Sequence, residues 1–108
     1  MIRILIVDNS DRAEQLKNAI EQNISCPEPM QVLCETDERE VVYRVEEENI
    51  DIVAIGLERT MLHKRIRYCK TIHPFILRYY KNDAITDILD TIQIYISPTT
   101  VRGYTYDS

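Results

Sequence analysis

The sequence predicts an α/β fold in which a four-stranded parallel sheet carries helices on both faces. Four short runs rich in β-branched residues alternate with four segments of helical periodicity. The connections between them are short, and right-handed crossovers then place helices on both sides of the sheet. The length of 108 residues suits one domain. We therefore predict one sheet with strand order 2-1-3-4, within a domain that spans residues 1–96.

The first strand and helix are expected in residues 2–8 and 9–23. The strand, IRILIVD, is apolar on both faces, which is typical of a central parallel strand. Asn9 or Ser10 can cap the helix that follows. Its inner face is predicted from the residues at helical spacing, which are Ala13, Leu16, Ala19 and Ile20.

The second unit follows an interruption by two prolines within CPEP, residues 26–29, which cannot lie inside a helix. Residues 30–36 are predicted to form a strand and residues 37–49 a helix. Asp37 and Glu40 resemble a capping box at the start of that helix. Its expected inner face consists of Val41, Val42 and Val45.

The third and fourth strands are predicted in residues 50–56 and 73–80, separated by a helix in residues 59–72. A closing helix is predicted in residues 82–96, with Asn82 or Asp83 as its cap, and residues 97–108 are expected to form a loose tail. The apolar stripe of the shorter helix is predicted from Leu62, Ile66 and Cys69. The inner face of the closing helix is predicted from Ala84, Ile85, Ile88, Leu89 and Ile92.

Composition narrows the possible functions. The chain has 44% hydrophobic and 29% charged residues, and no apolar run long enough to cross a membrane. Its first residues show no cleavable signal pattern, so we expect a cytoplasmic protein. The three cysteines have no metal-binding spacing and are expected to be reduced thiols.

Charge is distributed unevenly along the chain. The net charge is −5, yet residues 59–82 contain seven basic side chains and no acidic one. Such a block can be a solvated face, can dock on an acidic protein surface, or can bind the phosphates of a nucleic acid, with Tyr68 able to stack on a base. The sequence contains no known DNA-binding module, and the net negative charge of the whole chain argues against a dedicated nucleic-acid binder.

Three stretches together resemble a known family. RILIVDNSDRAEQLKNAI, EENIDIVAIGL and FILRYYKNDAITDIL follow in the order of the first strand and helix, the third strand, and the closing strand and helix of a response-regulator receiver domain. The resemblance covers most of residues 1–96 and implies a flavodoxin-like fold. Only about 19 residues separate the third strand from the closing one, so one strand–helix unit of a full receiver is missing. In an alternative register, residues 74–80 are the fourth strand and the fifth is lost.

The resemblance implies a regulatory domain whose phosphorylation chemistry has been lost. Receivers hold Mg²⁺ with an acidic pair and phosphorylate an aspartate at the end of the third strand. Here Asp8 keeps the first acidic position, Asn9 takes the second, and Gly56 stands at the acceptor position. The phosphate-contacting lysine is replaced by Arg78, and the cis proline that follows it by Tyr79. The chain is therefore expected to be a shortened pseudo-receiver without enzymatic activity.

The remaining site predictions concern a metal and a partner. Asp8 and Glu58 could hold Mg²⁺ weakly, or could be solvated acids with Asp8 helping to cap the first helix. We expect no other cofactor. A protein partner or a second copy is expected to bind a face made by the closing strand, the closing helix and the basic helix beside them, with Arg59, Lys64, Arg67, Lys70, Arg78, Tyr79, Tyr80 and Lys81. Two alternatives remain, a nucleic-acid-associated regulator that uses residues 59–81 and a small-ligand sensor or residual enzyme that uses Asp8 and Glu58.

Overall fold

The computed structural model describes residues 1–57, 60–68 and 73–96. Within these residues the predicted class is confirmed, with parallel strands and helices in strict alternation. The strands are β1 (Ile2–Val7), β2 (Met30–Glu35), β3 (Ile52–Ile55) and β4 (Phe75–Arg78). The helices are α1 (Ser10–Asn23), α2 (Glu38–Glu47), α3 (Leu62–Arg67) and α4 (Ile85–Ile96). The predicted tail, residues 97–108, lies outside the described residues.

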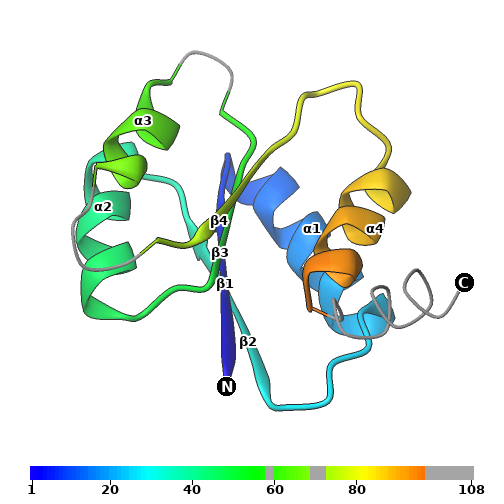
Figure 1. The fold of residues 1–108 in the computed structure, drawn as a ribbon. Coiled ribbons are helices and arrows are strands. Elements are labelled where there is room, and N and C mark those ends of the chain that lie inside the picture. The colour runs from blue at the N-terminus through cyan, green and yellow to red at the C-terminus, as the bar shows by residue number, and fades with distance from the viewer. Residues whose placement is uncertain (58–59, 69–72, 97–108) are drawn as a thin grey trace, which may run out of the picture.

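The sheet has the order β2-β1-β3-β4, as predicted, and every pair of neighbouring strands is parallel. Helices α1 and α4 cover one face and α2 and α3 cover the other, as the edge-on view of Figure 1 shows. This layered arrangement is compatible with a flavodoxin-like fold. The carboxyl ends of the strands lie together at one end of the sheet, which is where ligands bind in folds of this kind.

Two hydrophobic clusters, one on each face, hold the layers together. Alternation along β1 explains them, because Ile4 and Ile6 pack toward α1 and α4 while Leu5 and Val7 pack toward α2 and α3. All four side chains are fully buried. A strand that is apolar on both faces is thus a strand covered on both faces, as the sequence predicted.

The helix starts follow their capping residues, with one correction. Asn9 caps α1, since its Oδ1 accepts a hydrogen bond from the Arg12 N–H at 3.0 Å. Asp37 caps α2 and accepts from the Arg39 N–H at 2.9 Å. The capping box predicts that Glu40 accepts from the Asp37 N–H, but the Glu35 carboxylate accepts this hydrogen bond instead, at 3.1 Å.

The two later helices are shorter than the sequence predicts. Helix α3 begins at Leu62 instead of residue 59, because the Thr60 hydroxyl accepts from the Leu62 N–H at 3.0 Å and starts the first turn. Helix α4 begins at Ile85, because the Asp83 carboxylate accepts from the Tyr80 N–H at 2.7 Å and closes a turn before it. Ala84 and Ile85, predicted to face inward, are exposed.

The buried face of α4 is made of Ile88, Ile92 and Ile96. None of the described helices is long and apolar enough to cross a membrane. Cys26 and Cys34 are free thiols, whereas Cys69 lies outside the described residues.

Candidate functional site

Asp8 lies directly after β1, at the carboxyl end of the sheet, and its side chain is 1% exposed. Each of its carboxylate oxygens is engaged by protein groups. Oδ1 accepts a hydrogen bond from the Asn9 N–H at 2.7 Å, and Oδ2 accepts one from the Tyr79 hydroxyl at 2.7 Å. The Arg12 Nε lies 3.4 Å from Oδ2. A buried carboxylate needs such compensation, and here the chain itself supplies it.

Gly56 follows β3 and lies against the same carboxylate. Its N–H donates to the Val7 carbonyl at 2.8 Å, which holds the backbone close to β1. A methyl group on its Cα would lie 2.5 Å from Tyr79 Cζ and 2.6 Å from Tyr79 Cε2, and would overlap Asp8 Oδ2. Real carbon atoms do not approach so closely, so this position accepts only glycine while the Tyr79 ring stays in place.

Tyr79 fills the space above Gly56. Its side chain is 5% exposed, and the Arg12 guanidinium lies over its ring at 5.7 Å from the ring centroid. Burial and, next, the hydrogen bond to Asp8 raise the pKa of the Tyr79 hydroxyl above its ordinary value. The hydroxyl therefore stays protonated and remains a donor. Tyr79 was predicted to lie on the binding face, and the structure instead places it in the interior.

Arg12 and the inward position of Tyr79 were missed by sequence reasoning. The spacing of Asp8 and Arg12, four residues apart where a helix begins, was the available signal for their ion pair. No local sequence pattern predicts the contact between Tyr79 and Asp8, because the two residues are 71 positions apart in the chain.

The predicted metal pair is not assembled within the described residues, since Glu58 lies outside them. No group of three or more His, Cys, Asp or Glu side chains suited to a metal occurs in residues 1–57, 60–68 and 73–96. Asp8 already has a cation beside it, the Arg12 guanidinium. Chemically, the arrangement is a buried carboxylate whose charge is balanced by Arg12 and which also accepts a hydrogen bond from the Tyr79 hydroxyl.

The residues predicted to bind a partner lie on two sides of the sheet. Lys64 and Arg67 are exposed on α3, which packs beside α2. Tyr80 and Lys81 lie on the opposite side, in the connection from β4 to α4. The prediction that the basic helix lies beside the closing helix is therefore wrong, because the connection after β4 carries α4 to the face of the sheet opposite α3. Arg59 and Lys70 lie outside the described residues.

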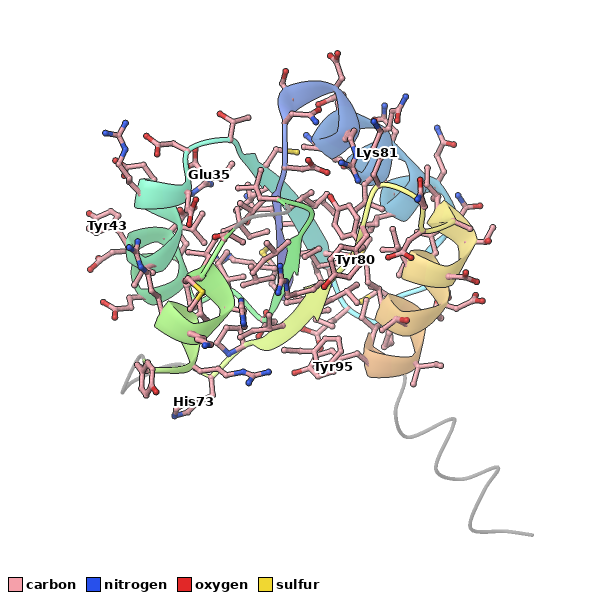
Figure 2. All side chains as sticks on the ribbon, turned by 90° about the horizontal axis from the view of Figure 1, so that it is seen from above. Glu35, Tyr43, His73, Tyr80, Lys81 and Tyr95 are labelled. Atoms are coloured by element: carbon pink, nitrogen blue, oxygen red, sulfur yellow. The ribbon has the colours of Figure 1, made fainter. Side chains whose placement is uncertain are left out.

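A pocket of about 230 Å³ opens between α1 and α4 at the carboxyl end of the sheet. Figure 2 looks toward this end and shows Lys81 over α1, with Tyr80 nearer the centre of the molecule. Residues from both helices and from the connection before α4 line the pocket, among them Arg12, Leu16, Tyr80, Lys81, Asp83 and Ile88.

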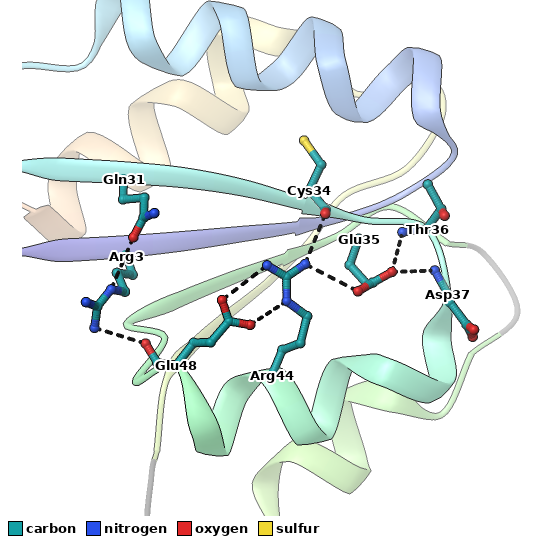
Figure 3. A network of polar contacts seen from close by, with 8 residues as sticks. All are labelled: Arg3, Gln31, Cys34, Glu35, Thr36, Asp37, Arg44 and Glu48. Carbon is teal, nitrogen blue, oxygen red and sulfur yellow. Dashed lines mark hydrogen bonds and ion pairs between the residues drawn. The ribbon is translucent and has the colours of Figure 1, made fainter.

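The sheet ends on β2 at one side and on β4 at the other. At the β2 edge, Nη1 of Arg44 donates to the Cys34 carbonyl at 3.1 Å and to Glu35 at 3.3 Å. Its Nε also donates to Glu48 at 2.5 Å, which holds the guanidinium in place (Figure 3). The pKa of Arg44 is raised by these carboxylates, Glu48 first.

The β4 edge has a different character. All four of its residues are half-buried, and Phe75 stacks on Tyr95 of α4 with ring centroids 4.6 Å apart. Tyr95 is 42% exposed and the neighbouring Ile94 is 56% exposed. An apolar surface therefore continues from the β4 edge onto the last turn of α4.

Comparisons of the chain with protein-family models, with curated proteins and with solved structures find no match.

Proposed function

We propose that the chain is a receiver-like regulatory protein that cannot be phosphorylated and that acts through contacts with other proteins. The observation that carries this proposal is the packing above Gly56. The Tyr79 ring and the Asp8 carboxylate fill the space in which an acceptor side chain would stand. The proposal rests on the resemblance to receivers together with this filled site.

The chemistry of phosphoryl transfer explains why the filled site matters. An acceptor carboxylate needs a divalent cation to neutralise charge on the transferred group. Gly56 supplies no acceptor, and the Asp8 charge is met by Arg12 and the Tyr79 hydroxyl. We therefore propose that the protein is not an enzyme and needs no Mg²⁺.

The surface proposed for contact with proteins is the apolar one at the β4 edge, formed by Phe75, Ile94 and Tyr95. Edge strands offer backbone groups for pairing, and exposed apolar side chains beside them favour association. The β2 edge, in contrast, has one carbonyl taken by Arg44. We propose a homodimer through the β4 edge as the simplest assembly. Its place of action is proposed to be the cytoplasm, where free thiols such as Cys26 and Cys34 persist.

Two experiments test the two halves of this proposal. Incubation with acetyl phosphate and Mg²⁺, followed by intact-mass measurement, should give no phosphorylated species. An acid-stable or acid-labile phosphoryl adduct on the chain would contradict the loss of chemistry.

Sedimentation velocity over a range of protein concentrations tests the assembly. The wild type should associate, and Tyr95→Glu should remain monomeric because it places charge in the apolar surface. The double variant Lys64→Glu/Arg67→Glu, altered on the opposite face, is the matched control and should associate like the wild type. A monomeric wild type, or association lost only in the α3 variant, would refute the proposed surface.

Nucleic-acid binding through residues 59–81 is the second candidate. The observation that favours it is the side chain of Tyr68, which is 83% exposed next to the exposed Lys64 and Arg67. It requires affinity for single-stranded nucleic acid that falls steeply with salt and that is lost in Lys64→Glu/Arg67→Glu. Filter binding at two salt concentrations distinguishes it from the assembly through β4.

A further inference from the structure

We propose that the pocket between α1 and α4 is a binding site for a small aromatic anion, such as an aryl phosphate or an aryl carboxylate. The pocket lies at the carboxyl end of the sheet and at the start of α4, whereas the proposed protein contact uses the last turn of α4, and the inference does not depend on that contact. Its volume of about 230 Å³ is smaller than that of pockets for drug-sized ligands, so we expect a ligand no larger than one ring with a charged head.

Two cations from different parts of the chain line the pocket. Arg12 comes from the first turn of α1, and Lys81 from the connection between β4 and α4. Lys81 is exposed and takes part in none of the ion pairs among the described residues. Its ammonium group is therefore available to an anion that enters the pocket.

Arg12 is held in place without using up its donors. Its Nε faces Asp8 at 3.4 Å, and its guanidinium lies over the Tyr79 ring. Within the described part of the chain, no hydrogen bond is formed by its two terminal nitrogens, and its side chain is 29% exposed. A planar guanidinium fixed in this way presents paired N–H groups, the geometry that phosphate and carboxylate oxygens accept best.

The rest of the pocket favours an aromatic body. Leu16 and Ile88, at 2% and 5% exposure, form its apolar floor. Tyr80 stands at the wall with half of its side chain exposed, and the Arg78 guanidinium lies 5.7 Å from its ring centroid. An aromatic ring can pack against such a wall while its charged head reaches Lys81 and Arg12.

The one acid at the pocket, Asp83, is already engaged. Its Oδ2 accepts a hydrogen bond from the Tyr80 N–H at 2.7 Å. This bond fixes the turn that carries Lys81, and it disperses part of the negative charge. Asp83 therefore shapes the pocket, while the Lys81 ammonium and the two terminal nitrogens of Arg12 are the donors that an anionic ligand would contact.

The test is a titration followed by two-dimensional ¹H–¹⁵N NMR, with phenyl phosphate as the probe. Inorganic phosphate serves as the head group alone and benzyl alcohol as the neutral ring alone. We expect saturable shifts confined to residues 12–16 and 79–88, with phenyl phosphate binding more tightly than either fragment. Lys81→Gln should weaken its binding about tenfold through the lost charge-assisted contact. The matched control is Lys17→Gln, a lysine of α1 that lies near Cys34, and its binding should equal that of the wild type.

The same spectra show whether each variant is folded, so loss of binding is not confused with loss of structure. Shifts that are spread over α3 and every other basic surface would overturn the proposal, as would equal binding by Lys81→Gln. Absence of saturable shifts at millimolar phenyl phosphate would overturn it as well. None of these outcomes depends on the oligomeric state, which the sedimentation experiment measures separately.

Discussion

Replacing Gly56 by alanine tests the filled site most directly. The added methyl group would lie 2.5 Å from Tyr79 Cζ and would overlap Asp8 Oδ2, so the ring must move. Overpacking of a core costs about 1–3 kcal/mol. Displacing the ring also breaks the hydrogen bond from Tyr79 to a charged acceptor, which contributes about 1.5–3 kcal/mol. One displacement of the Tyr79 ring removes the overlap and breaks the hydrogen bond together, so the two costs do not add in full. We expect Gly56→Ala to lower the free energy of unfolding by about 2–4 kcal/mol.

Urea unfolding followed by circular dichroism measures this loss. A double-mutant cycle with Tyr79→Leu supplies the control, because leucine keeps an apolar side chain but lacks the two ring atoms that meet the methyl group. The coupling energy should be at least about 1 kcal/mol, with Gly56→Ala better tolerated once the ring is gone. A loss below about 0.5 kcal/mol, or an additive cycle, would refute the close packing of Tyr79 over Gly56.

Three further predictions concern the groups around this site and the β2 edge. Tyr79→Phe should lower the free energy of unfolding by about 1.5–3 kcal/mol because buried Asp8 loses a donor, whereas Tyr43→Phe, at an exposed side chain, should change it little. Because the pKa of the Tyr79 hydroxyl is raised in the folded chain, its contribution to stability is complete below about pH 10 and is lost above that, where the unfolded chain releases the proton first. The free energy of unfolding obtained from urea titrations should therefore fall above about pH 10 by up to about 1.4 kcal/mol per pH unit more in the wild type than in Tyr79→Phe. Arg44→Met should lower the free energy of unfolding by about 1–2 kcal/mol, measured in urea, because Glu35 and the Cys34 carbonyl lose a shared donor.

Each of these has a clear contrary result. Equal losses in Tyr79→Phe and Tyr43→Phe would mean that the hydroxyl bond to Asp8 contributes nothing. If the free energy of unfolding falls equally with pH above about pH 10 in the wild type and in Tyr79→Phe, a group other than the Tyr79 hydroxyl causes the loss. An unchanged urea midpoint in Arg44→Met would show that its contacts at the β2 edge are replaced by water without cost.

The fold was predictable because its signals are local. Strands that are apolar on both faces, such as β1 and β3, alternate with amphipathic helices, and this alternation fixes a covered parallel sheet. Asn9 was correctly identified as a candidate cap because its side chain acts only three residues away. The predicted starts of α3 and α4 were wrong because Thr60 and Asp83 form turns that the spacing of apolar residues does not reveal.

The candidate site was only half predictable. Gly56 and Asp8 could be placed at the carboxyl ends of neighbouring strands from the strand pattern alone. That Tyr79 points inward could not, because a tyrosine at the end of an edge strand reads the same in either orientation. Its inward orientation uses the space over Gly56 and the hydrogen bond to the buried Asp8 carboxylate, and both arise only when β1, β3 and the end of β4 come together in the folded chain.

The Arg44 contacts also have a consequence for how the chain folds. Arg44 belongs to α2, yet its guanidinium donates to the Cys34 carbonyl of β2. This carbonyl at the sheet edge is therefore hydrogen-bonded only after α2 has docked. Before α2 docks, the backbone groups at the outer edge of β2 can pair with strands of other partly folded chains. Refolding yield should therefore decline as protein concentration rises, and Arg44→Met should make that decline steeper, even under conditions in which the finished protein is stable.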